Sequence, residues 1–208
     1  MESNDKKYWE KMYSIEKWMK LAQGRFFSKV FNQLLSGDVK AKLSNENLSF
    51  CDFGCGLGNF SDNLRMLFPN ADVSAIDYSE TAIDWAKKHY PKVHFKNMDY
   101  RDMTDSYDVM ITSNTLEHFS NPLEVITKLL QHTKRYFIML VPFEESPLYW
   151  EHLFSFQKSF FDNQFENFDL IYLRALDCSG LWNTMWLGKQ VVAILKRRES
   201  GEMSKCVG

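Results

Sequence analysis

Apolar side chains recur every three or four residues over the first stretch of the chain. One set consists of Tyr8, Met12, Ile15, Trp18 and Met19, and a second of Phe26, Phe27, Val30, Phe31 and Leu34. This spacing predicts two amphipathic helices, separated at Gly24 and ended by residues 36–38. Two roles fit them: an N-terminal helical lid that keeps water from a pocket, or a cover over a sheet edge. The candidate lid residues are Tyr8, Trp9 and Trp18.

After residue 47, short apolar runs alternate with helical spacing. The apolar runs are residues 48–53, 72–76, 93–96, 107–112 and 136–141, and the helical spacing covers residues 60–68, 81–89 and 122–132. Such alternation predicts βαβ units, in which a parallel sheet carries helices on both faces. Two last apolar runs, residues 168–176 and 190–196, have no helical pattern between them and are expected to pair antiparallel. The sequence therefore predicts an α/β fold with a doubly wound, Rossmann-like, seven-stranded, mostly parallel sheet whose last strand is antiparallel.

The first predicted strand runs into a glycine-rich segment with the sequence Asp52-Phe53-Gly54-Cys55-Gly56-Leu57-Gly58. Ligands of doubly wound sheets lie beyond the carboxyl ends of the strands, and glycine lets a ligand approach the main chain closely. A dinucleotide loop has its third glycine one residue later, and a Walker loop needs a Gly-Lys-Ser/Thr sequence that this chain lacks. Asp52 would repel a phosphate and attract an ammonium group. The loop therefore favours S-adenosylmethionine, which carries an ammonium group and no phosphate.

Acidic and aromatic side chains follow the next two predicted strands. Asp77 closes the second strand, at about the distance from the glycine loop where an acidic side chain reaches ribose hydroxyls in nucleotide-binding βαβ units. Asp99 follows the third strand, where its carboxylate could accept a hydrogen bond from the adenine amine. Tyr78, Met98 and Tyr100 could sandwich the adenine ring.

In their order and spacing, these three elements resemble those of the class I S-adenosylmethionine-dependent methyltransferase family, over about residues 48–142. In that family an acidic-x-Gly-x-Gly-x-Gly loop, an acidic end of strand two and an Asp after strand three bind the cofactor. The resemblance implies S-adenosylmethionine as the cofactor and a methyltransferase of the small-molecule type. The expected cofactor-binding residues are Asp52, Gly54, Cys55, Gly56, Gly58, Asp77, Tyr78, Met98, Asp99, Tyr100 and Asn114.

The acceptor side is expected around residues 112–119, which follow the fourth predicted strand. The family that the chain resembles often has a similar Leu-Glu-His stretch beside the methionine part of the cofactor, which Asn114 is placed to contact. His118 is a candidate catalytic base because its unperturbed pKa lies near neutrality, and the alternative is a structural role in the loop. His152 is a second candidate base, in the insertion that covers the acceptor pocket in related methyltransferases. Methyl transfer can also proceed largely by positioning the reactants, so activity does not require a base.

The expected reaction moves a methyl group to an O or N atom of a small-molecule acceptor and releases S-adenosylhomocysteine. Small-RNA 3′-terminal 2′-O-methyltransferases are similar here and bind a metal through Glu-x-x-Glu-His and a later His. This chain has Glu117, His118 and His152, but Asn114 stands in place of the first Glu, so no metal site is expected. A NAD-dependent oxidoreductase is disfavoured by Asp52 and the early third glycine. A non-catalytic S-adenosylmethionine-binding relative would show a damaged loop, and this loop is intact.

Charge and composition narrow the partners and the compartment. The chain has a formal net charge of −2 and no extended basic stripe, so no nucleic-acid partner is expected. Its four cysteines show no metal-ligand spacing, and no apolar run reaches the length of a membrane span. The N-terminus lacks the apolar core of a signal peptide, so a cytoplasmic protein without a membrane partner is expected. The sequence carries no signal for an oligomeric state.

The length of 208 residues suits a single methyltransferase domain. We expect residues 1–47 to form an N-terminal helical cap, residues 48–142 the cofactor-binding half and residues 143–198 the acceptor-side half, with residues 199–208 as a tail. Aromatic residues make up 15% of the chain. Most of them are expected in the core, and the others along a pocket for a flat or apolar acceptor.

Overall fold

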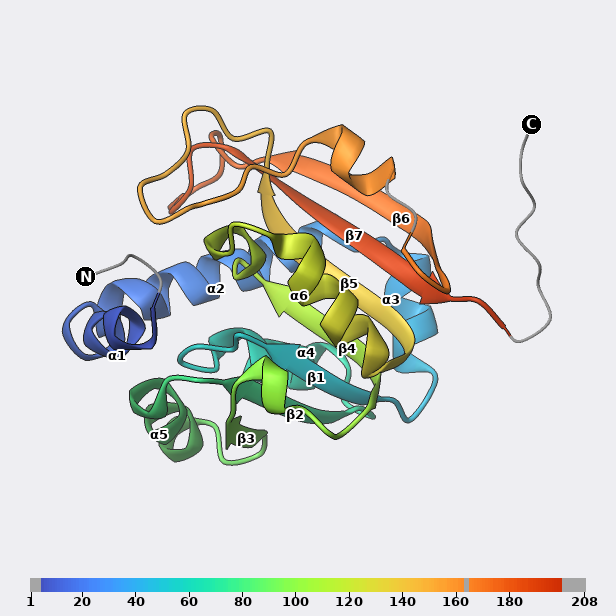
Figure 1. Ribbon diagram of the computed structural model, residues 1–208, viewed down its shortest axis with the longest axis horizontal. Coiled ribbons are helices and arrows are strands. Elements are labelled where there is room, and N and C mark those ends of the chain that lie inside the picture. Colours follow the sequence, from blue (N-terminus) through green and yellow to red (C-terminus); the bar gives the residue numbers. More distant parts are fainter. Residues whose placement is uncertain (1–4, 163–164, 200–208) are drawn as a thin grey trace.

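A seven-stranded sheet runs through the centre of the computed structural model, which describes residues 5–162 and 165–199 (Figure 1). Its strands are β1 (Ser49–Phe53), β2 (Asp72–Asp77), β3 (His94–Asn97), β4 (Tyr107–Ser113), β5 (Thr133–Phe143), β6 (Phe168–Asp177) and β7 (Lys189–Arg197). The strand order is β3-β2-β1-β4-β5-β7-β6, and β7 is antiparallel to both of its neighbours while the other pairs are parallel. The predicted fold class, with its antiparallel last strand, is confirmed.

The strand order reverses beside β1, which brings the carboxyl ends of three strands to one edge of the sheet. β1 pairs with β2 on one side and with β4 on the other, so that Phe53 lies opposite both Ile76 and Thr112. In a doubly wound sheet this switch point is where ligands bind. The loops that follow β1, β2 and β4 are therefore positioned to share one site.

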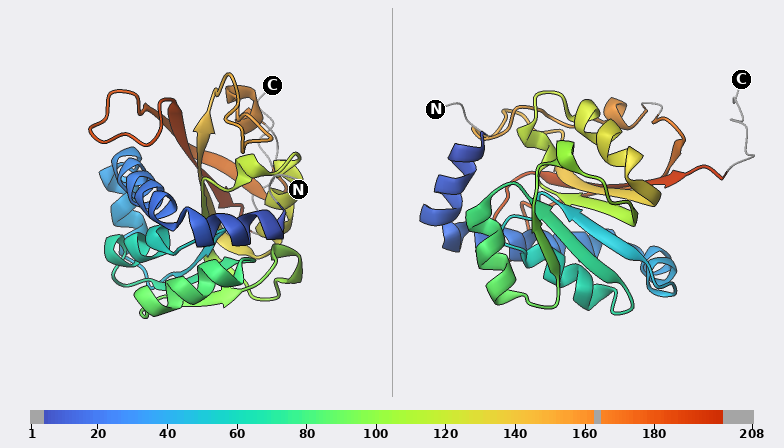
Figure 2. Two further views of the ribbon diagram at one scale, coloured as in Figure 1. Left: turned by 90° about the vertical axis from the view of Figure 1, so that its left-hand side faces the viewer. Right: turned by 60° about the horizontal axis from the view of Figure 1, so that its bottom comes forward.

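Helices cover both faces of the sheet (Figure 2). The α-helices are α1 (Lys6–Ile15), α2 (Lys17–Leu34), α3 (Gly37–Ser44), α4 (Asn59–Leu67), α5 (Glu80–His89) and α6 (Pro122–Gln131), and the 3-10 turns are η1 (Tyr100–Asp102), η2 (Leu116–His118) and η3 (Lys158–Asp162). Side chains of α2, α4 and α5 pack in the core on one face, and side chains of α6 and η3 pack on the other. Within the described part of the chain, no helix is long and apolar enough to cross a membrane.

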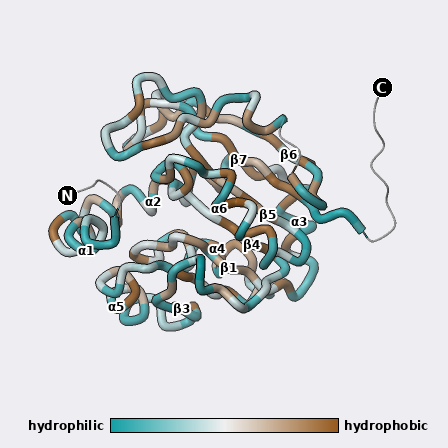
Figure 3. Tube along the Cα trace, viewed as in Figure 1, coloured by the Kyte–Doolittle hydropathy of each residue, from teal (hydrophilic) through white to brown (hydrophobic). Residues whose placement is uncertain are grey.

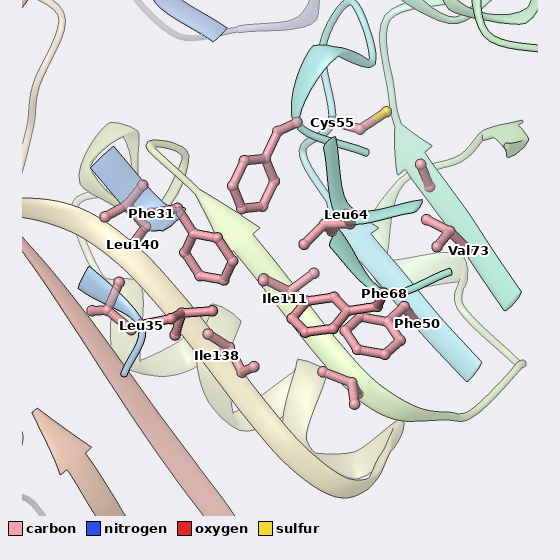
Figure 4. Close-up of a cluster of buried hydrophobic side chains, with 14 of the residues drawn as sticks. Phe31, Leu35, Phe50, Cys55, Leu64, Phe68, Val73, Ile111, Ile138 and Leu140 are labelled. Atoms are coloured by element: carbon pink, nitrogen blue, oxygen red, sulfur yellow. The ribbon is translucent and has the colours of Figure 1, made fainter. Parts of the chain in front are cut away.

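Large apolar side chains fill the core beneath α2 and α4 (Figure 4). Phe31 of α2 and Leu64 of α4 are fully buried against Phe50 and Ile111 of the sheet. Phe50 also stacks on Phe68, with 5.2 Å between the ring centroids. Hydrophobic runs follow the central strands β5 and β7, as Figure 3 shows. Strands that are covered on both faces need apolar side chains on both, which is why these runs are continuous rather than alternating.

The two N-terminal helices separate at a different residue from the one predicted. The break lies at Glu16, which ends α1 and begins α2, and Gly24 lies inside α2. A Cβ at Gly24 would come within 3.0 Å of the Cβ of Asn59, so this glycine allows α2 to pack closely on α4. A glycine in a helical pattern indicates either a break or a close approach, and here it serves the second purpose.

The second predicted helix ends as expected, since α2 stops at Leu34, but α3 was not predicted from the sequence. Ser36 caps α3, because its hydroxyl accepts a hydrogen bond from the backbone N–H of Val39 at 3.4 Å. The strand predicted over residues 136–141 is too short, because β5 continues through Pro142 to Phe143. The pairing of β4 with β5 ends at Leu140, so the N–H that proline lacks removes no bond between those two strands. Of the expected tail, residues 200–208 lie outside the described residues.

Candidate functional site

A cavity of about 1310 Å³ opens at the carboxyl edge of the sheet. Its walls come from α1 and α2, from the loops after β1, β2, β3 and β4, and from residues 143–152 and 177–189. The predicted site residues that line it are Asp52, Gly54, Cys55, Gly56, Asp77, Tyr78, Met98, Asp99, Tyr100, Asn114, His118 and His152. Residues from five separate segments of the chain thus meet in one cavity, and Gly58 does not line it.

The first two glycines of the loop adopt a backbone that other residues avoid. The φ angles of Gly54 and Gly56 are +70° and +50°. A Cβ at Gly54 would lie 2.3 Å from Cγ2 of Thr115, and one at Gly56 would lie 2.7 Å from the hydroxyl of Tyr13. Between them, Cys55 is buried, and burial raises the pKa of its thiol well above the usual range. The loop therefore presents bare backbone and a neutral thiol to the cavity.

Gly58 serves packing rather than the cavity wall. It lies at the start of α4 with a φ of +80°, and a Cβ there would come within 2.7 Å of the ring of Phe95 and 3.1 Å of the Cβ of Ala86. Its position in the motif thus lets α4 begin close to β3 and α5. A role in cofactor binding, as expected from the sequence, would be indirect.

Asp77 ties the glycine loop to the start of α5. Its Oδ2 accepts a hydrogen bond from the backbone N–H of Gly56 at 2.8 Å, and its Oδ1 accepts one from the N–H of Ser79 at 2.9 Å. The side chain is buried, and burial raises its pKa to about 6, although these two N–H groups oppose the shift. Asp77 lines the cavity, so its carboxylate can both hold the loop and meet a ligand.

Asp52 lies deeper, at the end of β1. Ser61 donates its hydroxyl hydrogen to Oδ2 of Asp52 at 2.6 Å. Burial raises the pKa of Asp52 to about 7; the hydrogen bond from Ser61 opposes this shift and the charge of Asp77 adds to it. The loop thus places a carboxyl group that titrates near neutrality against the cavity.

Four candidates for an adenine pocket, Tyr78, Met98, Asp99 and Tyr100, follow the adjacent strands β2 and β3 and line the cavity. Asp99 is already engaged with Arg101, whose Nη2 atom and backbone N–H donate to its carboxylate at 2.5 and 2.9 Å. These bonds hold the pKa of Asp99 below its usual range. The pairing with Arg101 was not indicated by the sequence, and it fixes the orientation of this carboxylate.

Asn114 lies where the chain leaves β4, with a φ of +49°. Its backbone N–H donates to the carbonyl of Leu140 at 2.8 Å, and Gln190 donates through Nε2 to its Oδ1 at 3.0 Å. Asparagine adopts such left-handed backbone more readily than most residues. The side chain that the sequence assigns to the methionine part of the cofactor is therefore held in place by β7.

Glu117, His118 and His152 come together in the cavity. One carboxylate oxygen and one ring nitrogen from each histidine lie within 4.8 Å of one another. Glu117 is only 1% exposed, and among the described residues neither of its carboxylate oxygens has a hydrogen-bond partner. Nδ1 of His118 lies 3.0 Å from the carbonyl oxygen of Glu151, and Nδ1 of His152 lies 2.7 Å from Oε2 of Glu145. Both histidines could be identified from the sequence, but Glu145 and Glu151, whose oxygens lie beside the Nδ1 atoms, could not.

Burial affects the pKa of all three residues of this cluster and decides the direction of the shift at Glu117 and His118. It raises the pKa of Glu117 to about 7 and lowers that of His118 to about 3, so His118 is neutral at physiological pH. Burial also disfavours the charged form of His152, but the hydrogen bond to Glu145 and the neighbouring carboxylates outweigh it and raise its pKa.

Helix α1 closes one side of the cavity and contacts both of its ends. At one end, beside the start of α5, Glu10 accepts hydrogen bonds from the backbone N–H groups of Glu80 at 2.7 Å and Thr81 at 3.1 Å, and from the hydroxyl of Ser79 at 3.0 Å. These are the first groups of α5, whose helix dipole favours a negative charge at that end. Glu10 therefore caps α5 from another helix.

At the other end, α1 contacts residues that follow β5. The hydroxyl of Tyr8 donates to Oε1 of Glu151 at 2.5 Å, and the Trp9 ring packs edge-on against His118 with 4.8 Å between centroids. Of the predicted lid residues, Tyr8 and Trp9 thus meet the site, whereas Trp18 is 78% exposed and does not line the cavity. The Glu10 and Glu151 contacts could not be predicted from the sequence, because their partners lie at least 69 positions away.

Removing the Glu10 carboxylate should loosen α1. In the Glu10→Ala variant, two backbone N–H groups of α5 lose their acceptor, which costs about 1–2 kcal/mol for a typical cap. We expect amide hydrogens of residues 6–15 and 79–83 to exchange faster by mass spectrometry. The matched control is Lys11→Ala, an exposed position on the same helix. Equal exchange in the two variants would show that Glu10 does not hold α1.

Comparison with known proteins identifies relatives of this chain. A family model for a methyltransferase domain matches residues 23–176. The malonyl-acyl-carrier-protein O-methyltransferase of Bacillus anthracis is 30% identical over 108 residues, which are 50% of this chain and 40% of that protein. The enzyme of the same name from Bacillus cytotoxicus is 32% identical over 108 residues, 50% of this chain and 38% of that protein. The chain thus spans about two fifths of the length of these relatives.

Solved structures share the fold at low sequence identity. The magnesium protoporphyrin IX methyltransferase of Synechocystis PCC 6803, with bound S-adenosylhomocysteine, has a TM-score of 0.67 at 16% identity and covers 93% of this chain and 100% of that chain. A methyltransferase in complex with the Trm112 activator of Haloferax volcanii has a TM-score of 0.71 at 13% identity, covering 92% and 98%. The family model matches well over half of the residues, so this chain belongs to the methyltransferase domain family, which confirms the resemblance found in its sequence.

Proposed function

We propose that this methyltransferase transfers the methyl group of S-adenosylmethionine to an O or N atom of a small-molecule acceptor and releases S-adenosylhomocysteine. The observation that carries the proposal is the junction of the glycine loop with Asp77 at the switch point of the sheet. Bare backbone and two buried carboxyl groups suit a cofactor that has an ammonium group and a ribose but no phosphate.

Each part of the cofactor has a proposed set of partners. Asp52 would face the ammonium group, and Asp77 would accept hydrogen bonds from the ribose hydroxyls. Asp99 would accept a hydrogen bond from the adenine amine, and Tyr78, Met98 and Tyr100 would pack against the adenine ring. Asn114 would contact the methionine part of the cofactor. Gly54, Cys55 and Gly56 would lie against the cofactor, and Gly58 would act indirectly by letting α4 begin close to β3 and α5. This assignment is supported by the cavity that these residues line together.

The cavity leaves room for an acceptor beside the cofactor. Its volume of about 1310 Å³ exceeds the range of roughly 300–1,000 Å³ that is typical of single-ligand pockets. Tyr149, Trp150 and Trp186 line it and suit a flat or apolar acceptor. His118 and His152 would contact the acceptor atom. The relatives carry different acceptors in their names, malonyl-acyl-carrier protein and magnesium protoporphyrin IX, so the acceptor is proposed only by class.

The protein does not need to form a covalent bond with either reactant. The acceptor atom forms a bond to the methyl carbon while the sulfur–methyl bond breaks, the sulfur keeps the electron pair, and the acceptor loses its proton to a side chain or to water. Residues on two walls of one cavity can hold donor and acceptor at reacting distance, which is a large part of the rate enhancement. Helix α1, part of the proposed cap of residues 1–47, would exclude water from that arrangement.

In this proposal, residues 48–142 bind the cofactor and residues 143–198 bind the acceptor. A cytoplasmic location and the absence of a nucleic-acid partner stay predictions. Incubation of the purified chain with S-adenosylmethionine that carries a labelled methyl group, together with a cell extract, tests the acceptor class and the absence of a nucleic-acid acceptor. We expect label in the small-molecule fraction, on oxygen or nitrogen. Label confined to the RNA fraction would contradict the proposed acceptor class.

The proposed role of Asp52 makes cofactor binding depend on pH. An ammonium ligand favours the ionised carboxylate, so below the pKa of about 7 binding must first remove a proton. Affinity for S-adenosylhomocysteine should therefore fall as the pH is lowered from about 7.5 to about 5.5, by up to about tenfold per pH unit below that pKa. The other titratable groups beside Asp52 are Asp77, with a pKa of about 6, and the thiols of Cys51 and Cys55.

The matched variant is Asp52→Asn, which keeps the shape of the side chain and cannot ionise. Its affinity should be lower at about pH 7.5 and flat down to about pH 6, where protonation of Asp77 begins to weaken binding. Calorimetric titrations at several pH values make the comparison. A wild-type affinity that does not change with pH would rule out a charged partner for the ammonium group at Asp52.

A further inference from the structure

Glu117, His118 and His152 converge from two separate segments of the chain. Glu117 and His118 belong to η2, and His152 follows β5 at a distance of 34 positions from His118. The backbone N–H of Leu153 donates to the carbonyl of Glu117 at 2.8 Å, and Nδ1 of His118 lies 3.0 Å from the carbonyl oxygen of Glu151, so both contacts join the two segments. These contacts hold the three side chains near one another. One carboxylate oxygen of Glu117 and one ring nitrogen of each histidine lie within 4.8 Å of one another.

Nδ1 is engaged in both imidazoles, which leaves Nε2 of each ring available to a ligand. A carbonyl oxygen can only accept a hydrogen bond, so Nδ1 of His118, 3.0 Å from the carbonyl of Glu151, carries the hydrogen. Nδ1 of His152 likewise donates to Oε2 of Glu145 at 2.7 Å. In the neutral rings, both lone pairs are then on Nε2, and Nε2 of His152 lies 4.0 Å from Oε1 of Glu117. A hydrogen bond from Nδ1 to a carbonyl or a carboxylate is the usual support of an imidazole that binds a metal through Nε2.

Among the described residues in this part of the cavity, the three carboxylates of Glu117, Glu145 and Glu151 pair with two basic side chains, His152 and Lys20. Glu117 is buried without a hydrogen-bond partner among the described residues, which is costly for a carboxylate. The carboxylates of Glu145 and Glu151 are nearly as deeply buried. Lys20 lies nearby, but its Nζ is paired with Glu151 at 3.2 Å. An additional cation would therefore be attracted to Glu117.

We propose that Glu117, His118 and His152 bind a divalent transition-metal ion, with zinc as the reference ion. Two imidazoles and one carboxylate suit zinc and its neighbours, whereas magnesium prefers oxygen ligands alone. Three protein ligands leave a coordination position open, and these residues line the cavity, so that position faces the acceptor. The ion would hold the O or N atom of the acceptor; this role rests on the proposed function.

A metal site at these residues differs from the expectation, drawn from the sequence, that no metal is bound. That expectation rested on Asn114 in place of a fourth ligand, and Asn114 is in fact bonded elsewhere, to Gln190. Coordination would also use the lone pairs of His118 and His152. These histidines would then position the acceptor through the ion and would not serve as general bases.

The test is a calorimetric titration of the full chain, without an affinity tag and stripped of metal, with zinc chloride. We expect one zinc ion per chain, and at least about tenfold weaker binding in Glu117→Gln, His118→Ala and His152→Ala. Glu145→Gln should also weaken binding while leaving all three ligands in place. The control is His132→Ala, because His132 lies outside the cavity and bonds to the carbonyl of Asp105. Circular dichroism checks that each variant folds.

S-adenosylhomocysteine is titrated into the same samples, which separates the two proposals. Zinc binding that is lost in Glu117→Gln and kept in His132→Ala supports the cation site, whether or not the nucleoside binds. Binding of S-adenosylhomocysteine without any zinc binding would overturn the cation site and leave the methyltransferase proposal intact. Zinc binding that is unchanged in Glu117→Gln, His118→Ala and His152→Ala would also overturn it.

Discussion

The Gly54→Ala variant should lose detectable binding of S-adenosylhomocysteine. The backbone at this position has a φ of +70°, which costs an L-residue about 1–2 kcal/mol. In addition, the new Cβ would lie 2.3 Å from Cγ2 of Thr115 and 2.6 Å from its Oγ1. Thr115 is itself hydrogen-bonded to the carbonyls of Gly54 and Ser113, so the loop rather than the threonine must move. Calorimetric titration measures the loss, and circular dichroism checks that the sheet remains.

A second glycine provides the control for this prediction. Gly37 lies at the start of α3 without a positive φ, and a Cβ there would meet nothing within 4 Å. Gly37→Ala should bind S-adenosylhomocysteine with unchanged affinity. If Gly54→Ala also bound with wild-type affinity, the glycine loop could not be the surface on which the cofactor lies.

Removal of the Asp77 carboxylate should have the next largest effect. In Asp77→Ala, the backbone N–H groups of Gly56 and Ser79 lose their acceptors, and the ribose loses its proposed partner. Hydrogen bonds to a charged group contribute about 1.5–3 kcal/mol each, so we expect affinity for S-adenosylhomocysteine to fall at least about tenfold. The melting temperature should fall as well, because the loop and α5 are no longer joined.

Asp72 offers a matched control at the other end of β2. Its side chain is 72% exposed and lies 3.4 Å from His94, away from the cavity. Asp72→Ala should leave both the affinity and the melting temperature almost unchanged, as expected for an exposed ion pair. An Asp77→Ala variant with wild-type affinity would remove Asp77 from the ribose site, even if its stability were reduced.

The order of strands and helices could be predicted because it depends on the local spacing of apolar residues. Each apolar run that was interpreted as a strand is one in the structure, and the missing helix between the last two runs correctly predicted their antiparallel pairing. Errors occurred where a local signal has two physical causes. Gly24 indicates a break or a close approach, and only the packing of α2 on Asn59 of α4 decides between them.

Some residues of the candidate site could likewise be predicted from local sequence, and others could not. Gly54 and Gly56 could be found from the sequence because a positive φ requires glycine wherever the rest of the chain lies. Glu10 could not be found, since its partners in α5 are brought to it by the tertiary fold. The same holds for Glu117, whose meeting with His152 depends on how the segment after β5 folds back over η2.

We propose that the cavity at the switch point holds S-adenosylmethionine, and a binding measurement can decide this. The purified chain is titrated with S-adenosylhomocysteine in a calorimeter, beside a titration with NAD under the same conditions. We expect one micromolar site for S-adenosylhomocysteine and no heat from NAD. Binding of NAD alone, or silence toward S-adenosylhomocysteine in a sample that circular dichroism shows to be folded, would contradict it.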